Sequence, residues 1–306
     1  MTHRLTPLCA LFFLPLGLMG CRKGEREGAD SARGTTLVLP SQPAVNTNWN
    51  PDAGPVMITS VDGRSDTVAV VLPEATDSTI ATLQGLSPPI SGLRFDLFGR
   101  GGKVGSAITA SPLPPVDPKQ ECDSWPLAKL QSPRANWRVG FASGHVQAIK
   151  VDSIEAMSST DSAALAASLA QAAATLPVTS DPTFRGLPFR VRSAYTFRLD
   201  SVDVVVADVV RSVNEEATPK LEHILIIGER PARTSGKYTV GYYSRTAGPE
   251  ESTQATEALA AVQLGTSKRP AIVVNVEYDD GGRLGFIERV GPGEWRATWR
   301  SAYTDC

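Results

Sequence analysis

The sequence predicts a β-rich fold of the α+β class, with antiparallel sheets and two short helices in the C-terminal part. Short segments in which apolar and polar residues alternate occur along most of the chain, as expected of strands with one buried face. Glycine, proline, asparagine and aspartate separate these segments. Only Ala163–Thr175 and Thr253–Leu264 combine high alanine content with the spacing of apolar residues that is typical of a helix.

The N-terminal part of the ordered chain is predicted to be a series of strands. Thr36–Leu39 opens the series, and Thr67–Leu72, Leu93–Phe98 and Lys103–Ala110 follow it. Four prolines then fall within residues 111–118, where we expect an extended segment, because proline lacks the amide donor that a sheet interior requires.

This proline-rich segment suggests the main domain boundary. We expect a β-rich domain or subdomain at 36–118 and an antiparallel sheet with two helices at 119–306. The second region begins with a predicted hairpin, in which Asn136–Ala142 and Val146–Val151 flank the loop Ser143-Gly144-His145.

The remaining elements follow in close succession. The first helix, Ala163–Thr175, can be capped by Asp161 or a nearby serine or threonine, and Pro177 ends it. Val202–Val213 is apolar on both faces, which indicates a central strand. The other predicted elements are strands at Phe189–Leu199, Ile224–Ile227, Tyr238–Tyr243, Ala271–Tyr278, Leu284–Val290 and Trp295–Tyr303, with the second helix at Thr253–Leu264.

The first 20 residues have the features of a secretion signal. Arg4 supplies a positive charge, and the apolar stretch Leu8–Leu18 is shorter than the roughly 20 residues of a membrane-spanning helix. Leu18-Met19-Gly20-Cys21 ends this stretch with an aliphatic residue, a tolerant position, a small residue and a cysteine. This pattern resembles the lipobox of bacterial lipoproteins. The resemblance implies cleavage before Cys21 and lipid, including palmitate, on its thiol. The alternative is an ordinary secretion signal followed by an unrelated cysteine.

The segment after the signal is expected to be a flexible tether. Residues 21–35 are polar and charged and lack the apolar periodicity of a folded element. Lipid on Cys21 would anchor the chain stably to a membrane of the cell envelope. In lipoproteins of enteric-type bacteria, an aspartate after the lipidated cysteine favours retention at the inner membrane. Arg22 stands at that position here, so the resemblance implies the outer membrane.

Two cysteines remain once Cys9 has left with the signal and Cys21 has taken lipid. Exported proteins fold under oxidising conditions, so we expect a disulfide between Cys122 and Cys306. By loop-closure entropy this bond would stabilise the fold by on the order of 5 kcal/mol. Two free, buried thiols are the alternative.

The charge balance and the scarcity of histidine exclude several functions. The chain has 30 Lys and Arg against 32 Asp and Glu and no strongly basic run, so nucleic acid is not an expected partner. After removal of the signal only His145 and His223 remain, and no spacing matches a zinc site. We therefore expect neither a metal nor a cofactor.

Two short motifs resemble catalytic loops but depart from them. Gly99-Arg100-Gly101-Gly102-Lys103 lacks the serine or threonine that follows the lysine of a phosphate-binding loop, because Val104 stands there. Gly140-Phe141-Ala142-Ser143-Gly144-His145 does not have the Gly-x-Ser-x-Gly spacing of a strand-to-helix nucleophile turn. We interpret both as turns.

Two features carry weaker functional hypotheses. Arg190, Arg192 and Arg198 are predicted to share one strand face, which could bind phosphate or carboxylate groups of an anionic ligand. Alternatively, these arginines are solvated or pair with Asp203, Asp208 or Glu222. Asp208 lies inside the apolar run 204–210, where a carboxylate is buried only if it is paired, so a buried ion pair is expected. A catalytic acid with a perturbed pKa is the alternative.

These observations favour a membrane-anchored envelope lipoprotein that acts as a non-enzymatic binding or assembly module, with another envelope protein or an anionic ligand as its partner. An envelope hydrolase that uses the carboxylates of Asp208 and Glu222 is the first alternative. A passive structural lipoprotein is the second. Because the sequence contains no complete catalytic constellation, it leaves enzymatic activity undecided and inclines against it.

Overall fold

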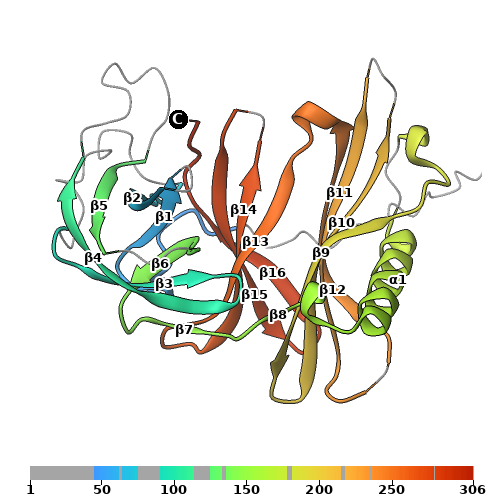
Figure 1. Cartoon of the computed structure of the whole chain (residues 1–306), viewed down its shortest axis with the longest axis horizontal. Helices are drawn as coiled ribbons and strands as arrows, with labels where there is room; N and C mark the ends of the chain where they lie inside the picture. Colours follow the sequence, from blue (N-terminus) through green and yellow to red (C-terminus); the bar gives the residue numbers. More distant parts are fainter. Residues whose placement is uncertain are drawn as a thin grey trace, which may run out of the picture. The chain divides into compact units, whose positions relative to one another are not determined.

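The chain is described here from a computed structural model (Figure 1). The described residues are 45–61, 64–74, 90–113, 125–132, 136–177, 181–214, 218–234, 236–278 and 280–305. The expected signal, tether and first strand, together with Cys21, Cys122 and Cys306, lie outside these ranges. Within them, no helix is long and apolar enough to cross a bilayer.

The described residues form a β-rich fold of antiparallel sheets, as the sequence predicts, with one α-helix. A closed six-stranded barrel has the strand order β1-β2-β5-β4-β3-β6. Valine, leucine and phenylalanine side chains that alternate along its strands fill the barrel interior. Its strands are β1 (Met57–Val61), β2 (Arg64–Val70), β3 (Arg94–Gly99), β4 (Gly102–Pro112), β5 (Leu127–Gln131) and β6 (Val139–Ala142).

Two five-stranded antiparallel sheets follow the barrel. The inner sheet has the order β16-β15-β14-β13-β7, and the outer sheet has the order β12-β11-β10-β9-β8. The inner sheet contains β7 (Val146–Ala148), β13 (Ala255–Leu264), β14 (Arg269–Glu277), β15 (Gly282–Gly291) and β16 (Glu294–Arg300). The outer sheet contains β8 (Asp152–Ser153), β9 (Arg190–Leu199), β10 (Val202–Val213), β11 (Lys220–Pro231) and β12 (Thr239–Pro249).

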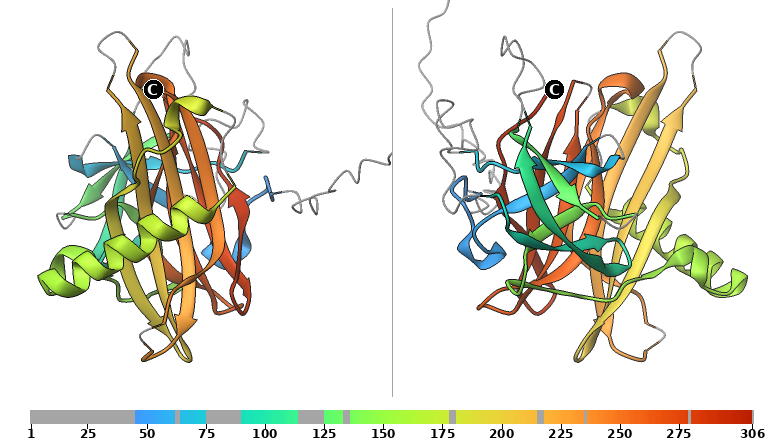
Figure 2. Two further views of the ribbon diagram at one scale, coloured as in Figure 1. Left: turned by 90° about the vertical axis from the view of Figure 1, so that its right-hand side faces the viewer. Right: turned by 60° about the vertical axis from the view of Figure 1, so that its left-hand side comes forward.

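The connections contain the helical elements. Helix α1 (Ser159–Thr175) lies between β8 and β9 in the sequence. It crosses the face of the outer sheet that is turned away from the inner sheet (Figure 2). Ser158 caps α1, because its hydroxyl accepts a hydrogen bond from the amide of Asp161. Four short 3₁₀ turns complete the description: η1 (Pro51–Ala53), η4 (Ile154–Ala156), η5 (Pro182–Phe184) and η6 (Glu250–Ser252).

Three buried clusters lie between successive layers of the fold, which are the barrel, the inner sheet, the outer sheet and α1. Between the barrel and the inner sheet, Phe141 of β6 lies 6.3 Å from Phe286 of β15, centroid to centroid, and Phe286 lies 4.7 Å from Trp299 of β16. Branched aliphatic residues such as Val206 fill the space between the two sheets. Leu169 and Ala173 of α1 cover the far face of the outer sheet. Both sheets are therefore buried on both faces over their centres.

The segment Thr253–Leu264 is not a helix, contrary to the sequence prediction. Ala255–Leu264 forms β13, which pairs with β14 along its length and with β7 at its end. The barrel covers one face of β13 and the outer sheet covers the other. A strand buried on both faces loses the apolar and polar alternation that identifies strands, and its alanines then resemble a helix.

The predicted hairpin around Ser143-Gly144-His145 does not form either. Strand β6 pairs with β1 and β3 inside the barrel, whereas β7 pairs with β13 of the inner sheet. The short loop therefore carries the chain from one sheet to the next. Local turn geometry cannot reveal this, because the partners of β6 and β7 are distant in the sequence.

The barrel takes strands from both sides of the expected boundary at residues 111–118. Strands β5 and β6 follow that segment in the sequence and complete the barrel begun by β1–β4. Pro112 itself lies at the end of β4, opposite Ala128. The division between the barrel and the two sheets falls instead between β6 and β7, at the loop 143–145.

Candidate functional site

The three predicted arginines occupy two different faces of the outer sheet. Arg198 donates a hydrogen bond of 2.8 Å from Nε to Asp203, and Nε of Arg192 lies 3.8 Å from Asp208. Asp203 and Asp208 belong to β10, which pairs with β11 without any register shift. Because their positions differ by an odd number, their side chains lie on opposite faces. The structure therefore does not bring all three arginines onto one face.

A bulge in β9 causes this separation. The register between β9 and β10 shifts between Asp208 and Val209, which pair with Ser193 and Val191 and leave Arg192 as the extra residue. Arg190 beyond the bulge makes only a long hydrogen bond, 3.4 Å from Nη2 to the hydroxyl of Ser212. A bulge reverses the alternation of side chains, so the sequence pattern alone misplaces the arginines that precede it.

Asp208 is largely buried beside a histidine. Its side chain is 15% exposed, and its Oδ1 lies 2.7 Å from Nε2 of His223, which is 2% exposed. The two groups are not aligned for a linear hydrogen bond, so the contact is close but imperfectly directed. Arg192 is the second neighbour of this carboxylate.

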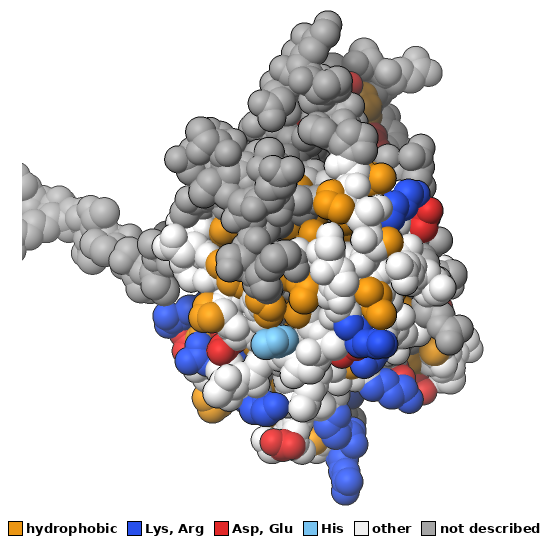
Figure 3. Space-filling view, turned by 90° about the vertical axis from the view of Figure 1, so that its left-hand side faces the viewer, with side chains coloured by type: hydrophobic (Ala, Val, Ile, Leu, Met, Phe, Trp, Pro, Cys, Tyr) orange, Lys and Arg blue, Asp and Glu red, His pale blue; other side chains and the backbone are white. Residues whose placement is uncertain are grey.

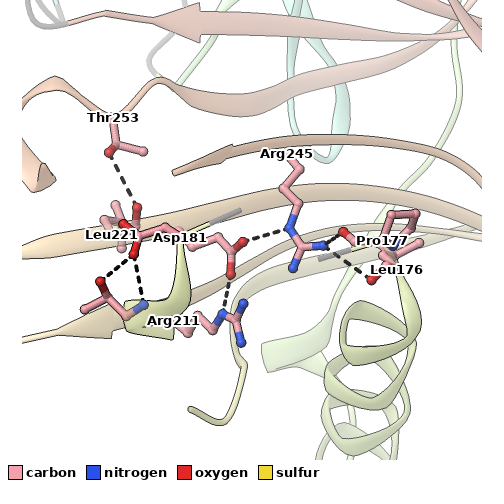
Figure 4. A network of polar contacts seen from close by, with 9 residues as sticks. Leu176, Pro177, Asp181, Arg211, Leu221, Arg245 and Thr253 are labelled. Atoms are coloured by element: carbon pink, nitrogen blue, oxygen red, sulfur yellow. Dashed lines mark hydrogen bonds and ion pairs between the residues drawn. The ribbon is translucent and has the colours of Figure 1, made fainter. Parts of the chain in front are cut away.

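Glu222 lies on the opposite face of the sheet from Asp208 and is fully buried between two arginines. Its carboxylate forms ion pairs with Arg211 and, at 2.8 Å, with Nε of Arg245 (Figure 4). Arg245 also donates to the carbonyl oxygens of Leu176 and Pro177, where α1 ends. Glu222 therefore ties the end of α1 to the sheet, and the carboxylate pair required by the hydrolase hypothesis is not assembled.

The Ser143-Gly144-His145 loop is held by Asp96 of β3, which the sequence analysis did not single out. Asp96 accepts hydrogen bonds from Ser143 at 2.9 Å and Ser106 at 2.8 Å, and it pairs with Lys103 at 2.9 Å. Burial raises the pKa of Asp96, but these donors outweigh burial and lower it overall. Ser143 therefore donates its hydrogen bond to a carboxylate whose lowered pKa makes it a weak base.

His145 is exposed at the same loop and lies against Gly54. A Cβ atom added at Gly54 would lie only 2.8 Å from the Cβ of His145, so this position needs glycine. Figure 3 shows the barrel side of the molecule, where described Lys and Arg side chains lie next to Asp and Glu side chains.

A second buried carboxylate, Glu229 of β11, links the two sheets. It accepts hydrogen bonds from Nε and Nη2 of Arg289 at 2.6 and 2.8 Å, from Nε1 of Trp295 at 2.7 Å and from the amide of Gly293 at 3.0 Å. Burial raises its pKa, but the hydrogen bonds outweigh burial and lower it overall. The satisfied carboxylate is a structural tie between the sheets.

A groove with a volume of about 1070 Å³ lies between α1 and the outer sheet. We call it the α1 groove. Among the residues of α1, only Leu169 and Ala173 are fully buried, so the helix meets the sheet mainly through its second half. The helix side of the α1 groove is lined by Asp161, Ala164, Leu165, Ala167, Ser168 and Gln171.

The sheet side of the α1 groove carries a charged cluster. Arg198, Asp203 and Arg230 come from β9, β10 and β11, and Lys237 and Tyr238 come from the following loop. Asp203 accepts the 2.8 Å hydrogen bond from Arg198 described above and one of 3.3 Å from a backbone amide. Burial raises the pKa of Asp203, but its cationic neighbours outweigh burial and lower it overall.

Of this cluster, the sequence indicated Arg198 and, as one possible partner of it, Asp203. Arg230 and Lys237 are separated from Arg198 by more than a strand in sequence, and only the register of the outer sheet brings them together. No local spacing signals such a cluster. Within the described residues, no group of three or more His, Cys, Asp or Glu side chains could hold a metal ion.

Comparison with known proteins identifies no relative. No protein-family model, no curated protein and no solved structure matches this chain. The function must therefore be inferred from the chemistry of the chain itself.

Proposed function

We propose that this chain is a lipid-anchored envelope lipoprotein whose folded part is a non-enzymatic binding module, with the α1 groove as its ligand site. The observation that carries the proposal is the groove itself. Its volume of about 1070 Å³ is at the upper end of the range typical of small-molecule sites. Its lining combines apolar helix residues with a few charged groups, as expected of a site that orients a ligand.

The proposed anchor comes from the sequence. Leu18-Met19-Gly20-Cys21 would be processed before Cys21, and residues 22–35 would act as the tether. Arg22 favours the outer membrane in this proposal. The proposal also includes a disulfide between Cys122 and Cys306, formed in the oxidising envelope.

Binding accounts for the buried charges better than hydrolysis does. Asp208 and Glu222 lie on opposite faces of the outer sheet, and Glu222 is held between two arginines. A passive structural role does not explain the α1 groove. A helix packed flat against the sheet would close the groove and bury more apolar surface, which would make the fold more stable. A ligand that enters the groove would explain why the helix stands away from the sheet.

A substitution that fills the groove tests this function. Ala164 and its neighbour Ala163 are both exposed on α1, but only Ala164 lines the groove. We expect Ala164→Trp to abolish complementation of a deletion strain while Ala163→Trp complements fully. Circular dichroism and membrane fractionation should show that both variants fold and reach the membrane. Full complementation by Ala164→Trp would refute the groove as the functional site.

A further inference from the structure

Arg230 is one of several charged side chains of the described residues with a buried nitrogen that makes no hydrogen bond, and among them it is the one that lines the α1 groove. Its Nε atom is buried and makes no hydrogen bond, since the nearest carboxylate oxygen, Oδ2 of Asp203, lies 3.6 Å away. Its Nη1 atom makes one long hydrogen bond, 3.4 Å to the carbonyl oxygen of Gly236. A guanidinium group offers five N–H donors, so most of the donors of Arg230 remain available.

The side chain of Arg230 is nevertheless held in place. Its Cζ atom lies 4.5 Å from the centroid of the Tyr238 ring, a cation–π contact that fixes the plane of the guanidinium group. The side chain is 28% exposed, so it is partly withdrawn from water. A fixed and partly desolvated guanidinium binds a planar or tetrahedral anion more strongly than a free surface arginine does.

Three cations and three carboxylates line the α1 groove, so the contacts of each group decide which charge is available to a ligand. Arg198, Arg230 and Lys237 surround the single carboxylate of Asp203, which Arg198 already engages directly. Lys237 donates to the neutral amide oxygen of Gln171, at 3.3 Å, and forms no ion pair with any residue that the structure describes.

The other two carboxylates of the groove are engaged elsewhere. Asp161 accepts a hydrogen bond of 2.7 Å from the hydroxyl of Ser158 at the start of α1. Asp152 of β8 lies 3.9 Å from Lys150. Neither is paired with Arg230, so they do not supply the missing anion.

We propose that Arg230, supported by Lys237, forms an anion subsite that binds the carboxylate or phosphate group of a small organic acid. The apolar part of that ligand would lie against Ala164 and Leu165 on the helix side of the groove. This inference rests on the proposed function, because it names the class of ligand that the α1 groove binds.

Matched water-soluble probes test the subsite on the full-length lipidated protein in a non-ionic detergent. Benzoate and phenylphosphate carry the anion on an apolar ring, benzamide has the same ring without charge, and inorganic phosphate lacks the ring. We expect benzoate or phenylphosphate to bind at millimolar concentration and raise the melting temperature. Benzamide and inorganic phosphate should bind about tenfold more weakly or worse.

Variants locate the binding. Arg230→Gln should weaken binding of the organic anions at least about tenfold, and Lys237→Gln, whose side chain is exposed and safe for the fold, should weaken it less. Arg233→Gln is the matched control, because Arg233 is exposed in the same loop but does not line the groove. It should bind like the wild type.

The outcomes separate the subsite from the groove. Loss of binding in Arg230→Gln and in Ala164→Trp, with normal binding in Arg233→Gln, would support both proposals. Equal binding of benzoate and benzamide that Ala164→Trp abolishes and Arg230→Gln leaves intact would overturn the anion subsite and leave the groove as a site. Phosphate that binds as tightly as phenylphosphate would overturn the organic-acid assignment. Absence of binding by every probe would overturn the subsite as well.

Discussion

At the scale of single residues, the fold depends on a few buried carboxylates with several donors each. Glu229, Glu222 and Asp96 each accept hydrogen bonds from or pair with at least two side chains of other elements. A buried carboxylate is stable only when such partners replace the lost water. Arg230 differs from these groups because its buried Nε atom makes no hydrogen bond and its nearest carboxylate, that of Asp203, is hydrogen-bonded to Arg198. In our proposal, this difference is the mark of a binding group.

The contribution of Glu229 can be measured directly. Glu229→Ala would leave the guanidinium group of Arg289, which is only 22% exposed, without its carboxylate. We expect the free energy of unfolding in urea to fall by about 3–5 kcal/mol. Glu294→Ala is the control, because the Glu294–Arg296 pair is almost half exposed and should be worth less than about 1 kcal/mol. Equal losses in the two variants would contradict the assigned role.

The same residue predicts a dependence of stability on pH. The pKa of Glu229 is lowered in the folded state from its ordinary value of 4.5. Its contribution is therefore complete above that ordinary value and is lost as the pH falls through the lower, folded-state pKa. Urea unfolding between about pH 5 and pH 3 should show a steeper loss of stability for the wild type than for Glu229→Gln. Parallel profiles would show that Glu229 does not titrate in this window.

The sequence could indicate that certain charged residues need partners and could suggest Asp203 and Asp208 for the arginines, but it could not indicate partners from distant strands. Asp208 within an apolar run is such an indication, and the structure places it beside Arg192 and His223. His223 comes from β11, and only the strand register selects it. The charged end of the α1 groove went unrecognised for the same reason, since its members are joined by strand pairing and not by spacing.

At the scale of elements, the sequence pattern predicted a strand more reliably when one face of the strand is exposed than when both faces are buried. Strands with one exposed side, such as β9, were predicted from alternation, and β10 was recognised as a central strand from its uninterrupted apolar residues. Strand β13 has the same double burial, but its alanines have a high intrinsic helix propensity. Tertiary packing overrode that propensity, because β14 and β7 supply backbone partners on both sides.

Amide hydrogen exchange can distinguish β13 from α1, although the sequence predicted a helix for both segments. The amides of β13 should exchange among the slowest of the protein, because they are paired and buried between the barrel and the outer sheet. The first half of α1 should exchange much faster, because its side chains are mostly exposed and its packing residues, Leu169 and Ala173, lie further on. Faster exchange in β13 than in α1 would contradict the assignment of β13 as a central strand.

At the scale of the whole molecule, the chain within residues 45–305 passes from the barrel to the two sheets at a different place from the proline-rich segment 111–118. Prolines mark residues that cannot donate to a sheet, and the end of β4 tolerates one, Pro112. The actual change of sheet occurs at a three-residue loop with ordinary turn residues. Sequence composition detects flexible connections, whereas a short connection between packed layers gives no such signal.

The proposed membrane anchor makes a prediction for the complete protein. Cells that express the wild type should incorporate labelled palmitate into the mature chain, because the Cys21 thiol is the proposed lipid acceptor. Cys21→Ser should abolish incorporation and leave a longer, unprocessed precursor. A variant that is still cut to the same length and released in soluble form would contradict the lipoprotein assignment.

The central claim is that the protein acts by holding a ligand in the α1 groove. Site-specific photo-crosslinking in intact envelopes tests it most directly, with the photoreactive residue placed at Ala164 inside the groove or at Ala163 outside it. Mass spectrometry of the purified chain should reveal a discrete adduct from position 164 and none from position 163. The same adducts from both positions, or no adduct from either, would contradict the claim.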